Sequence, residues 1–328
     1  MIKSDQKLSP DIFGDIKKAP TRDGFGHGLV EAAKADERIV AVCADLVEST
    51  RVEWFKKEFP TRFIEMGVAE QNLATVGSGL ANYGKIPFIT SYATFSPGRN
   101  NEQIRTTIAL NNVPVKIIGS HAGLSVGPDG ATHQALEDIG LMRMLPHMTV
   151  IVPADAEEAR KATLAIAKTD GPSYLRLGRS GTPSFTTPET PFEIGKANVI
   201  WESENPQVAL IACGYMVYNA LLAAKELQEA GIGSIVVDNH TIKPMDEKTI
   251  TSVAQKCGAV VTCEEHQVAG GMGSAVAEVL ARTNPVPMEF IGVHDQFGQS
   301  GEPEELFAHY KMDVKSIVEA GKRVIGRK

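Results

Sequence analysis

The stretch Met66-Gly-Val-Ala-Glu-Gln-Asn-Leu73 joins a strand-like run, Arg62–Glu65, to a helix-like run that ends near Tyr83. At about 100° per residue, Glu70 falls on the apolar face of this predicted helix, one turn before Leu73. The rest of that face is expected to be Val76, Gly77 and Leu80. A carboxyl group aimed at an apolar layer is costly unless it is hydrogen-bonded, paired or protonated. Glu70 is therefore either a helix-dipole partner or a functional acid.

The alternation of strands and helices continues along the whole chain. In the first half, the predicted strands are 39–44, 63–65, 87–92, 113–119, 148–152 and 173–177, and the predicted helices are 21–35, 52–58, 70–83, 101–110, 133–144 and 156–167. A smaller second series has strands at 208–213, 235–238, 259–263 and 288–293, and helices at 217–229, 246–255, 273–281 and 314–320. Near-continuous apolar strands between helices predict mainly parallel sheets covered on both faces.

The chain is expected to contain two open-sheet α/β domains, the second smaller than the first. Its 328 residues suit two domains, each with its own core. Residues 1–19 are predicted to be an arm, either flexible or wrapped on the protein, and 20–178 the first domain. A segment rich in Pro, Ser and Thr predicts a linker over 179–194, before a second domain at 195–328.

Composition excludes several classes of protein. The net charge is −7, and no basic run or Arg/aromatic patch indicates a nucleic-acid partner. No apolar run approaches the ~18 residues of a membrane span, and the N-terminus lacks a signal-peptide core. The four cysteines form no CxxC pair or zinc spacing, and three lie in apolar strand-like runs, so we expect a reducing cytoplasm.

Polar and aromatic side chains collect where the predicted strands end. In open parallel sheets, ligands bind beyond the carboxyl ends of the strands. The groups at these ends are Asp45, Ser49, the stretch 67–70, Tyr92, Phe95, His121, Arg176 and Arg179. None of them is specific alone, and their common placement predicts a site at this edge.

Some of these groups have two interpretations. Tyr92 and Phe95, spaced i, i+3, could pack in the core or form a stacking surface for a flat heterocycle. Arg22, Arg176 and Arg179 could clamp a phosphate, although most surface arginines do not.

The loop from His121 to His133 carries the densest signal. Its Gly127-Pro-Asp-Gly130 segment could be a simple turn before a helix. Two imidazoles and Asp129 in such a loop instead favour proton transfer and binding of substrate hydroxyls. No third ligand has a recognisable spacing, so we predict no metal site on this chain. The chain also lacks a GxGxxG, GxxxxGK[ST] or GxSxG motif, and hence an obvious phosphate cradle.

Three stretches together resemble transketolase. They are Phe63–Asn72, Ser120–His133 and Glu264–Ser274, in the family's order. From about Arg22 to the end, the chain is similar to the pyrimidine-binding domain followed by the C-terminal domain. The resemblance therefore implies thiamine diphosphate as cofactor. Because the diphosphate-binding domain is not recognised, it implies a split enzyme whose other subunit carries that domain and the Mg²⁺ ligands, expected to assemble as α₂β₂.

The resemblance also implies roles for residues. Glu70 matches the glutamate that hydrogen-bonds the cofactor's aminopyrimidine, and Tyr92 and Phe95 match its aromatic wall. A third family aromatic, a few residues on, is not evident, and the segment Gly98–Asn101 occupies that region. His121 matches a histidine at the phosphate end of the substrate, His133 one at the reacting hydroxyls, and Asp129 the aspartate that binds a sugar hydroxyl. The family's phosphate-binding residues are matched by Arg22, Ser49 and Arg179. Arg176 is a competing candidate for the place of Arg179. Asp45 is expected near the cofactor.

The expected activity is transfer of a two-carbon ketol unit from a ketose phosphate to an aldose phosphate, by a partner-dependent enzyme. The alternatives are a subunit of a deoxyxylulose-phosphate synthase-like or 2-oxoacid dehydrogenase-like enzyme, or a non-catalytic partner subunit. His121, in Ser120-His-Ala-Gly123, favours transketolase over the synthase. The Glu264-Glu-His266 motif is expected to be a structural interface.

Overall fold

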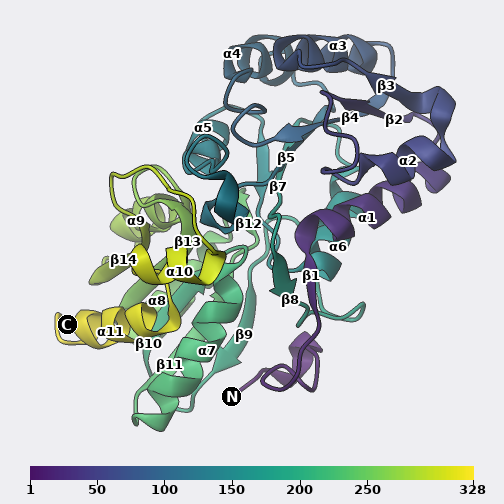
Figure 1. The fold of residues 1–328 in the computed structure, drawn as a ribbon. Helices are drawn as coiled ribbons and strands as arrows, with labels where there is room; N and C mark the ends of the chain where they lie inside the picture. The colour runs from purple at the N-terminus through teal and green to yellow at the C-terminus, as the bar shows by residue number, and fades with distance from the viewer.

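The strand–turn–helix unit around Glu70 is present in the computed structural model, which describes residues 1–328 (Figure 1). Strand β3 (Phe63–Glu65) turns at Gly67, whose φ is +67°, and α3 (Glu70–Asn82) begins at Glu70 itself. The buried face of α3 is Glu70, Leu73, Ala74, Gly77, Ser78 and Ala81. The predicted face was therefore rotated slightly: Val76 and Leu80 are half-buried, because the helix lies on strand β4 with Gly77 against Ile89.

The first sheet has seven strands in the order β12-β6-β7-β5-β4-β2-β3. All neighbouring pairs are parallel except β12 with β6. Its other strands are β2 (Ile39–Cys43), β4 (Ile86–Tyr92), β5 (Lys116–Ser120), β6 (Thr149–Ile151), β7 (Ser173–Arg176) and β12 (Thr241–Lys243). Helices α1 (Thr21–Ala35), α2 (Val52–Glu58) and α6 (Ala156–Ile166) pack together on one side of the sheet (Figure 1). Helix α3 packs against β4, and α5 (Asp138–Arg143) packs against β6.

The second sheet has five strands in the order β14-β13-β10-β11-β9, with only β9 antiparallel. These strands are β9 (Asn198–Glu202), β10 (Pro206–Ala212), β11 (Gly233–Asp238), β13 (Val260–Gln267) and β14 (Met288–Val293). The helices around this sheet are α7 (Met216–Glu229), α8 (Glu247–Cys257), α9 (Met272–Thr283), α10 (Pro303–His309) and α11 (Val314–Ile325). The two predicted α/β units with mainly parallel sheets are thus confirmed.

The two units are not independent, because β12 comes from the second half of the sequence and completes the first sheet. One hydrophobic cluster also runs through both, from Leu73 and Ile117 to Val237 and Met272. The site in the first unit is therefore supported from the second.

Several predicted elements were wrong. The helix expected at 133–144 begins only at Asp138, because the residues before it are held in a bridge between Ala122 and Ala135. The helix expected at 101–110 is a short α-helix, α4 (Asn101–Gln103), continued by a π-helix, η3 (Ile104–Ala109). Within the segment predicted as a linker, β8 (Gly181–Pro183) pairs with β1 (Lys18–Pro20).

The N-terminal arm is wrapped on the second unit. Ile2 forms a bridge with Trp201, and the Tyr218 hydroxyl donates to the carbonyl oxygen of Ile12 at 2.9 Å.

Short 3-10 turns lie at Ser4–Gln6 (η1), Pro60–Arg62 (η2) and Leu124–Asp129 (η4). All four cysteines are free and buried, and no helix is long and apolar enough to cross a membrane.

Candidate active site

Four rings from two loops meet beyond the carboxyl ends of β4 and β5. The Tyr92 ring stacks on His121 with centroids 3.9 Å apart, and on Phe95 at 6.1 Å. The His133 ring meets Tyr92 and Phe95 edge-on, at 6.0 and 5.5 Å. The structure thus brings together both aromatics and both histidines that the sequence singled out, and this cluster of rings forms an aromatic wall at the edge of the sheet.

Glu70 is 3% exposed and lies at the start of α3. Its carboxylate accepts a hydrogen bond from Nη1 of Arg99 at 2.8 Å, and Nδ2 of Asn100 donates to its backbone oxygen, also at 2.8 Å. The guanidinium of Arg99 in turn lies over the Phe95 ring, 4.7 Å from its centroid. The carboxyl expected at an apolar layer is therefore buried and paired beside the aromatic wall.

His121 is held from both sides of its ring. Nη1 of Arg22 lies 3.0 Å from its Nε2, and the Ser120 hydroxyl lies 2.9 Å from its Nδ1. Burial first, and then the charges of Arg22, Arg179 and Arg51, lower the pKa of His121 to about 3. His121 is therefore neutral at physiological pH, and its backbone is fixed in the left-handed region at φ +55°.

Arg22 also donates to the backbone oxygen of Ser49 at 2.9 Å, so two predicted phosphate residues are in contact. Its Nε is buried without a hydrogen-bond partner. A buried donor without a partner is a place that a ligand acceptor can fill.

Arg179 and Asp129 meet at the outer rim of the site. Nη1 of Arg179 donates to the Val126 oxygen at 2.9 Å and lies 3.3 Å from Oδ1 of Asp129. Both side chains remain about a third exposed or more, so either can turn to a ligand. Arg176 is different: it is 5% exposed, and its Nε donates to the buried Asp138 at 2.8 Å.

Asp45 is exposed at the end of β2 and has φ +57°. Glu65 accepts the backbone N–H groups of Asp45 and Gly67, at 2.8 and 2.9 Å, and so joins the loops after β2 and β3. Sequence reasoning missed Glu65, Ser120 and Arg99. Arg99 lies in the segment Gly98–Asn101, where the resemblance led us to expect a third aromatic, and this departure was the signal available.

The loop from His121 to His133 is held by the second unit. The backbone N–H of Ser125, in η4, donates to the buried carboxylate of Glu265, and Nη2 of Arg176 donates to the Glu265 backbone oxygen at 2.7 Å. Glu264 instead caps α9 through the N–H groups of Met272 and Gly273. Glu265 therefore connects the C-terminal half to the loop that carries Asp129.

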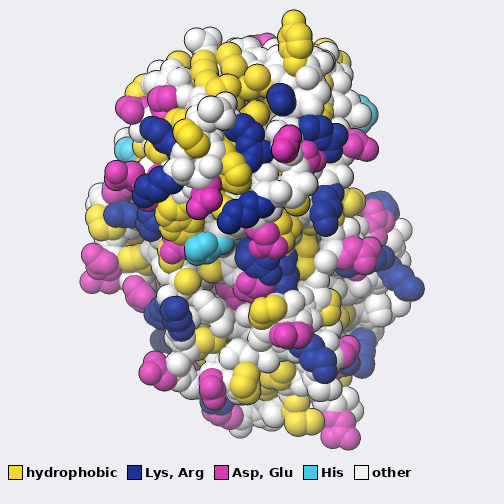
Figure 2. Space-filling view, turned by 90° about the vertical axis from the view of Figure 1, so that its right-hand side faces the viewer, with side chains coloured by type: hydrophobic (Ala, Val, Ile, Leu, Met, Phe, Trp, Pro, Cys, Tyr) yellow, Lys and Arg dark blue, Asp and Glu magenta, His cyan; other side chains and the backbone are white.

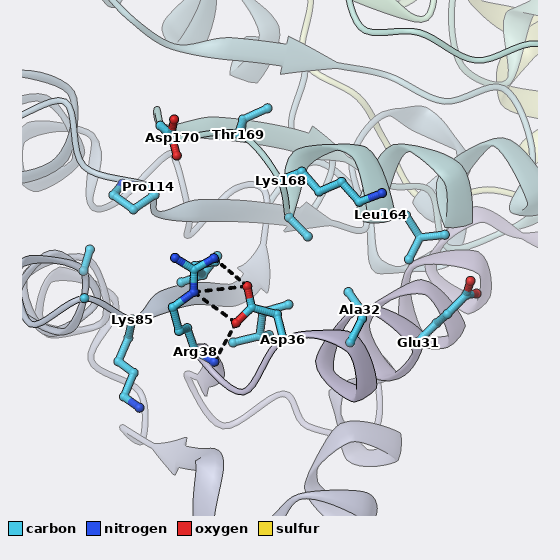
Figure 3. A pocket seen from close by; sticks show the side chains of 16 residues that line it. Glu31, Ala32, Asp36, Arg38, Lys85, Pro114, Leu164, Lys168, Thr169 and Asp170 are labelled. Atoms are coloured by element: carbon cyan, nitrogen blue, oxygen red, sulfur yellow. Dashed lines mark hydrogen bonds and ion pairs between the residues drawn. The ribbon is translucent and has the colours of Figure 1, made fainter.

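A separate cavity of about 540 Å³ lies away from this site, at the opposite, amino end of the strands. Figure 3 shows its lining, where Arg38 is paired with Asp36 at 2.6 Å. None of the predicted site residues lines it.

No group of three or more His, Cys, Asp or Glu side chains is arranged to hold a metal ion. Acidic and basic side chains are interspersed on the face seen in Figure 2, without a broad area of one sign.

Comparison with known proteins agrees with this architecture. Residues 17–184 match the transketolase pyrimidine-binding domain, and residues 195–317 match the transketolase C-terminal domain. The chain is 41% identical, over 94% of its length and 95% of the relative's, to a 6-deoxy-6-sulfo-D-fructose transketolase subunit from Clostridium sp.. It is 42% identical to a putative transketolase C-terminal section from Methanocaldococcus jannaschii, over 90% of this chain and 93% of that protein.

Solved structures give the same result. A structure described as a split gene transketolase, inactive beta4 tetramer, is 44% identical and superimposes with a TM-score of 0.87, covering 94% of this chain and 98% of that one. The transketolase of Campylobacter jejuni is 26% identical with a TM-score of 0.79, and the match covers 96% of this chain but 49% of that protein. The chain therefore belongs to the transketolase family, in which it corresponds to the subunits of split enzymes that contain the pyrimidine-binding and C-terminal domains.

Proposed function

We propose that this chain is the C-terminal subunit of a split transketolase, which transfers a two-carbon ketol unit from a ketose phosphate to an aldose phosphate. The observation that carries the proposal is the buried Glu70 carboxylate beside the stacked rings of Tyr92, Phe95 and His121. A glutamate that only complements the helix dipole does not require aromatic rings beside it. Binding of a flat heterocycle through a ring nitrogen requires both a buried carboxyl group and an aromatic surface.

The residues present fit the pyrimidine half of thiamine diphosphate. Bound thiamine diphosphate supplies a carbon nucleophile that also stores electrons. Glu70 would hold a proton at the ring nitrogen, and Tyr92 and Phe95 would orient the ring and exclude water. This chain offers no cluster of ligands for Mg²⁺, so the proposal assigns the metal and the diphosphate to the partner subunit.

On the substrate side, the contacts suggest a division of labour. Arg22, with its unpartnered Nε, the neighbouring Ser49 and the exposed end of Arg179 would bind the anionic end of the sugar. Asp129 and His133 would contact hydroxyl groups. His121 would act as a neutral ring that accepts from Arg22, and Asp45 would line the cofactor side.

The anionic end need not be a phosphate. Relatives include transketolase subunits named for 6-deoxy-6-sulfo-D-fructose and, at 37% identity in Phocaeicola vulgatus, for apulose-4-phosphate. Guanidinium groups bind planar or tetrahedral oxyanions of either kind. A panel of phosphorylated and sulfonated ketoses as donors would identify the sugar.

Partner dependence is the sharpest test. We propose an α₂β₂ assembly, since the related structure of beta chains alone is described as inactive. The purified chain should show no ketol transfer, and activity should appear when a polypeptide that carries the diphosphate-binding domain is added with thiamine diphosphate and Mg²⁺. Transfer by the chain alone would contradict the split arrangement. Binding of thiamine diphosphate without transfer, for every sugar tried, would favour a non-catalytic subunit.

A further inference from the structure

Arg99 makes the two contacts that the proposed function assigns to the cofactor's ring. Its Nη1 donates to the Glu70 carboxylate at 2.8 Å, while its flat guanidinium lies 4.7 Å from the Phe95 centroid. A planar cation that donates to Glu70 and stacks on Phe95 imitates a protonated aminopyrimidine. We propose that Arg99 closes the Glu70 pocket in the cofactor-free subunit and withdraws when the ring of thiamine diphosphate enters. This inference rests on the proposed function.

Burial explains why Arg99 would move and Glu70 would not. The Glu70 side chain is 3% exposed, whereas that of Arg99 is 50% exposed. A carboxylate buried without a partner is strongly disfavoured, so the free subunit gains from the pair. Arg99 can return its charged end to water at little cost because half of it is already hydrated.

The backbone around Arg99 is fixed, so its withdrawal needs only a change of side-chain rotamer. The Arg99 N–H donates to the Phe95 oxygen at 3.0 Å. The next residue, Asn100, is fully buried and donates to the backbone oxygen of Glu70 at 2.8 Å. Gly98 packs so closely that an added Cβ would lie 2.1 Å from the Thr94 oxygen. The loop therefore holds the guanidinium stem beside Glu70 without moving itself.

The pair should raise the apparent dissociation constant of the cofactor, because only the fraction of molecules with Arg99 withdrawn can bind the ring. In the complex reconstituted with the partner subunit, Arg99→Ala and the more conservative Arg99→Gln should lower the Kd for thiamine diphosphate about three- to tenfold. Titration followed by calorimetry or by intrinsic fluorescence measures this without any turnover. Arg105→Ala is the matched control, since Arg105 is exposed in the same segment and does not contact Glu70.

The outcomes separate the two proposals. Unchanged or weaker cofactor binding in Arg99→Ala and Arg99→Gln, with both variants folded by circular dichroism, would overturn the role of Arg99 and leave the proposed function intact. If the wild-type complex does not bind thiamine diphosphate at all, the proposed function itself fails. A second measurement uses the free chain: Arg99→Ala should lower its melting temperature, and Glu70→Gln added to that variant should restore part of the loss. If the double variant instead lost as much melting temperature as Arg99→Ala and Glu70→Gln lose together when made singly, the pair would not be coupled.

Discussion

Nη1 of Arg22 lies 3.0 Å from Nε2 of His121, and this contact determines where the imidazole carries its proton. A guanidinium can only donate hydrogen bonds. Nε2 of His121 must therefore accept, and the ring proton is on Nδ1, toward the Ser120 hydroxyl at 2.9 Å. A histidine in this state can orient other groups, but it cannot donate from Nε2 while Arg22 remains in place.

His121 should therefore remain neutral down to about pH 4, because its pKa is lowered to about 3. Since the unfolded chain binds this proton near the ordinary pKa of 6.5, the stability that His121 contributes is present above pH 6.5 and is lost as the pH falls toward 3. Nitrogen-15 NMR of the imidazole should show an Nδ1–H tautomer without titration between about pH 5 and 8. Arg22→Gln should raise the His121 pKa without restoring 6.5, because burial is the largest cause, whereas Arg38→Gln at the far end should not change it. A wild-type titration near pH 6.5 would contradict this assignment.

The adjacent residues Glu264 and Glu265 should have separable effects. Glu265→Gln weakens the hold on the Ser125 N–H and on the loop that carries Asp129, so the KM for the sugars should rise several-fold with a smaller fall in kcat. Glu264→Gln affects only the cap of α9 and should lower stability by about 1 kcal/mol with KM unchanged. Steady-state kinetics of the reconstituted enzyme and urea unfolding make the comparison. Equal effects of the two substitutions on KM would mean that Glu265 has only a structural role.

Much of the fold followed from local patterns, and several of the failures share one cause. The limits of α1, α2, β3 and β14 were predicted correctly from apolar periodicity alone. The strands β1, β8, β9 and β12 and the helix α10 were missed. Of these, β12 is only three residues long and exists because distant β6 offers it an antiparallel edge. Such pairing leaves no periodic signal in the sequence.

The candidate site shows the same limit. The rim residues could be listed because the carboxyl ends of parallel strands meet at one edge. Which of them are paired depends on side chains far apart in sequence, as with Arg99 and Glu70 or Arg176 and Asp138. The sequence left Arg176 and Arg179 as competing candidates for the phosphate. Because Arg176 is already paired with buried Asp138, Arg179 is the better candidate for binding the phosphate.

A buried pair of carboxyl groups, Asp238 at the end of β11 and Glu158 in α6, should make the junction of the two units sensitive to pH. Burial raises the pKa of Asp238 to about 7, and burial with the charge of Asp238 raises that of Glu158. Asp155 also faces the pair, and the Ala154 N–H donates to Glu158 at 2.7 Å. Because the folded chain binds a proton that the unfolded chain has already released above about pH 4, stability should fall as the pH rises from about 4 to about 7.

Asp238→Asn should remove this dependence and stabilise the chain at about pH 8 by on the order of 1–2 kcal/mol, since an amide can donate to Glu158 without binding a proton. Urea unfolding at about pH 5 and about pH 8 measures the effect. Asp246→Ala is a control of opposite sign, because Asp246 caps α8 through the Thr249 N–H and its loss should cost about 1 kcal/mol. Destabilisation by Asp238→Asn at the higher pH would show that the pair does not share a proton.

Replacement of Glu70 tests the centre of the proposed site. Glu70→Gln keeps the shape and the Asn100 contact, which is made through the backbone oxygen of residue 70. The amide cannot hold a proton at the cofactor's ring, so hydrogen–deuterium exchange at the thiazolium carbon of bound thiamine diphosphate should slow by at least about 100-fold. Exchange is measured by acid quench and NMR in the reconstituted enzyme, and ketol transfer should fall in parallel. Glu65→Gln, at the neighbouring turn, is the matched control and should leave exchange within a few-fold of the wild type. If Glu70→Gln exchanged at a near-normal rate while it bound the cofactor, Glu70 would have no role in activating it, and the buried carboxylate would need a structural explanation.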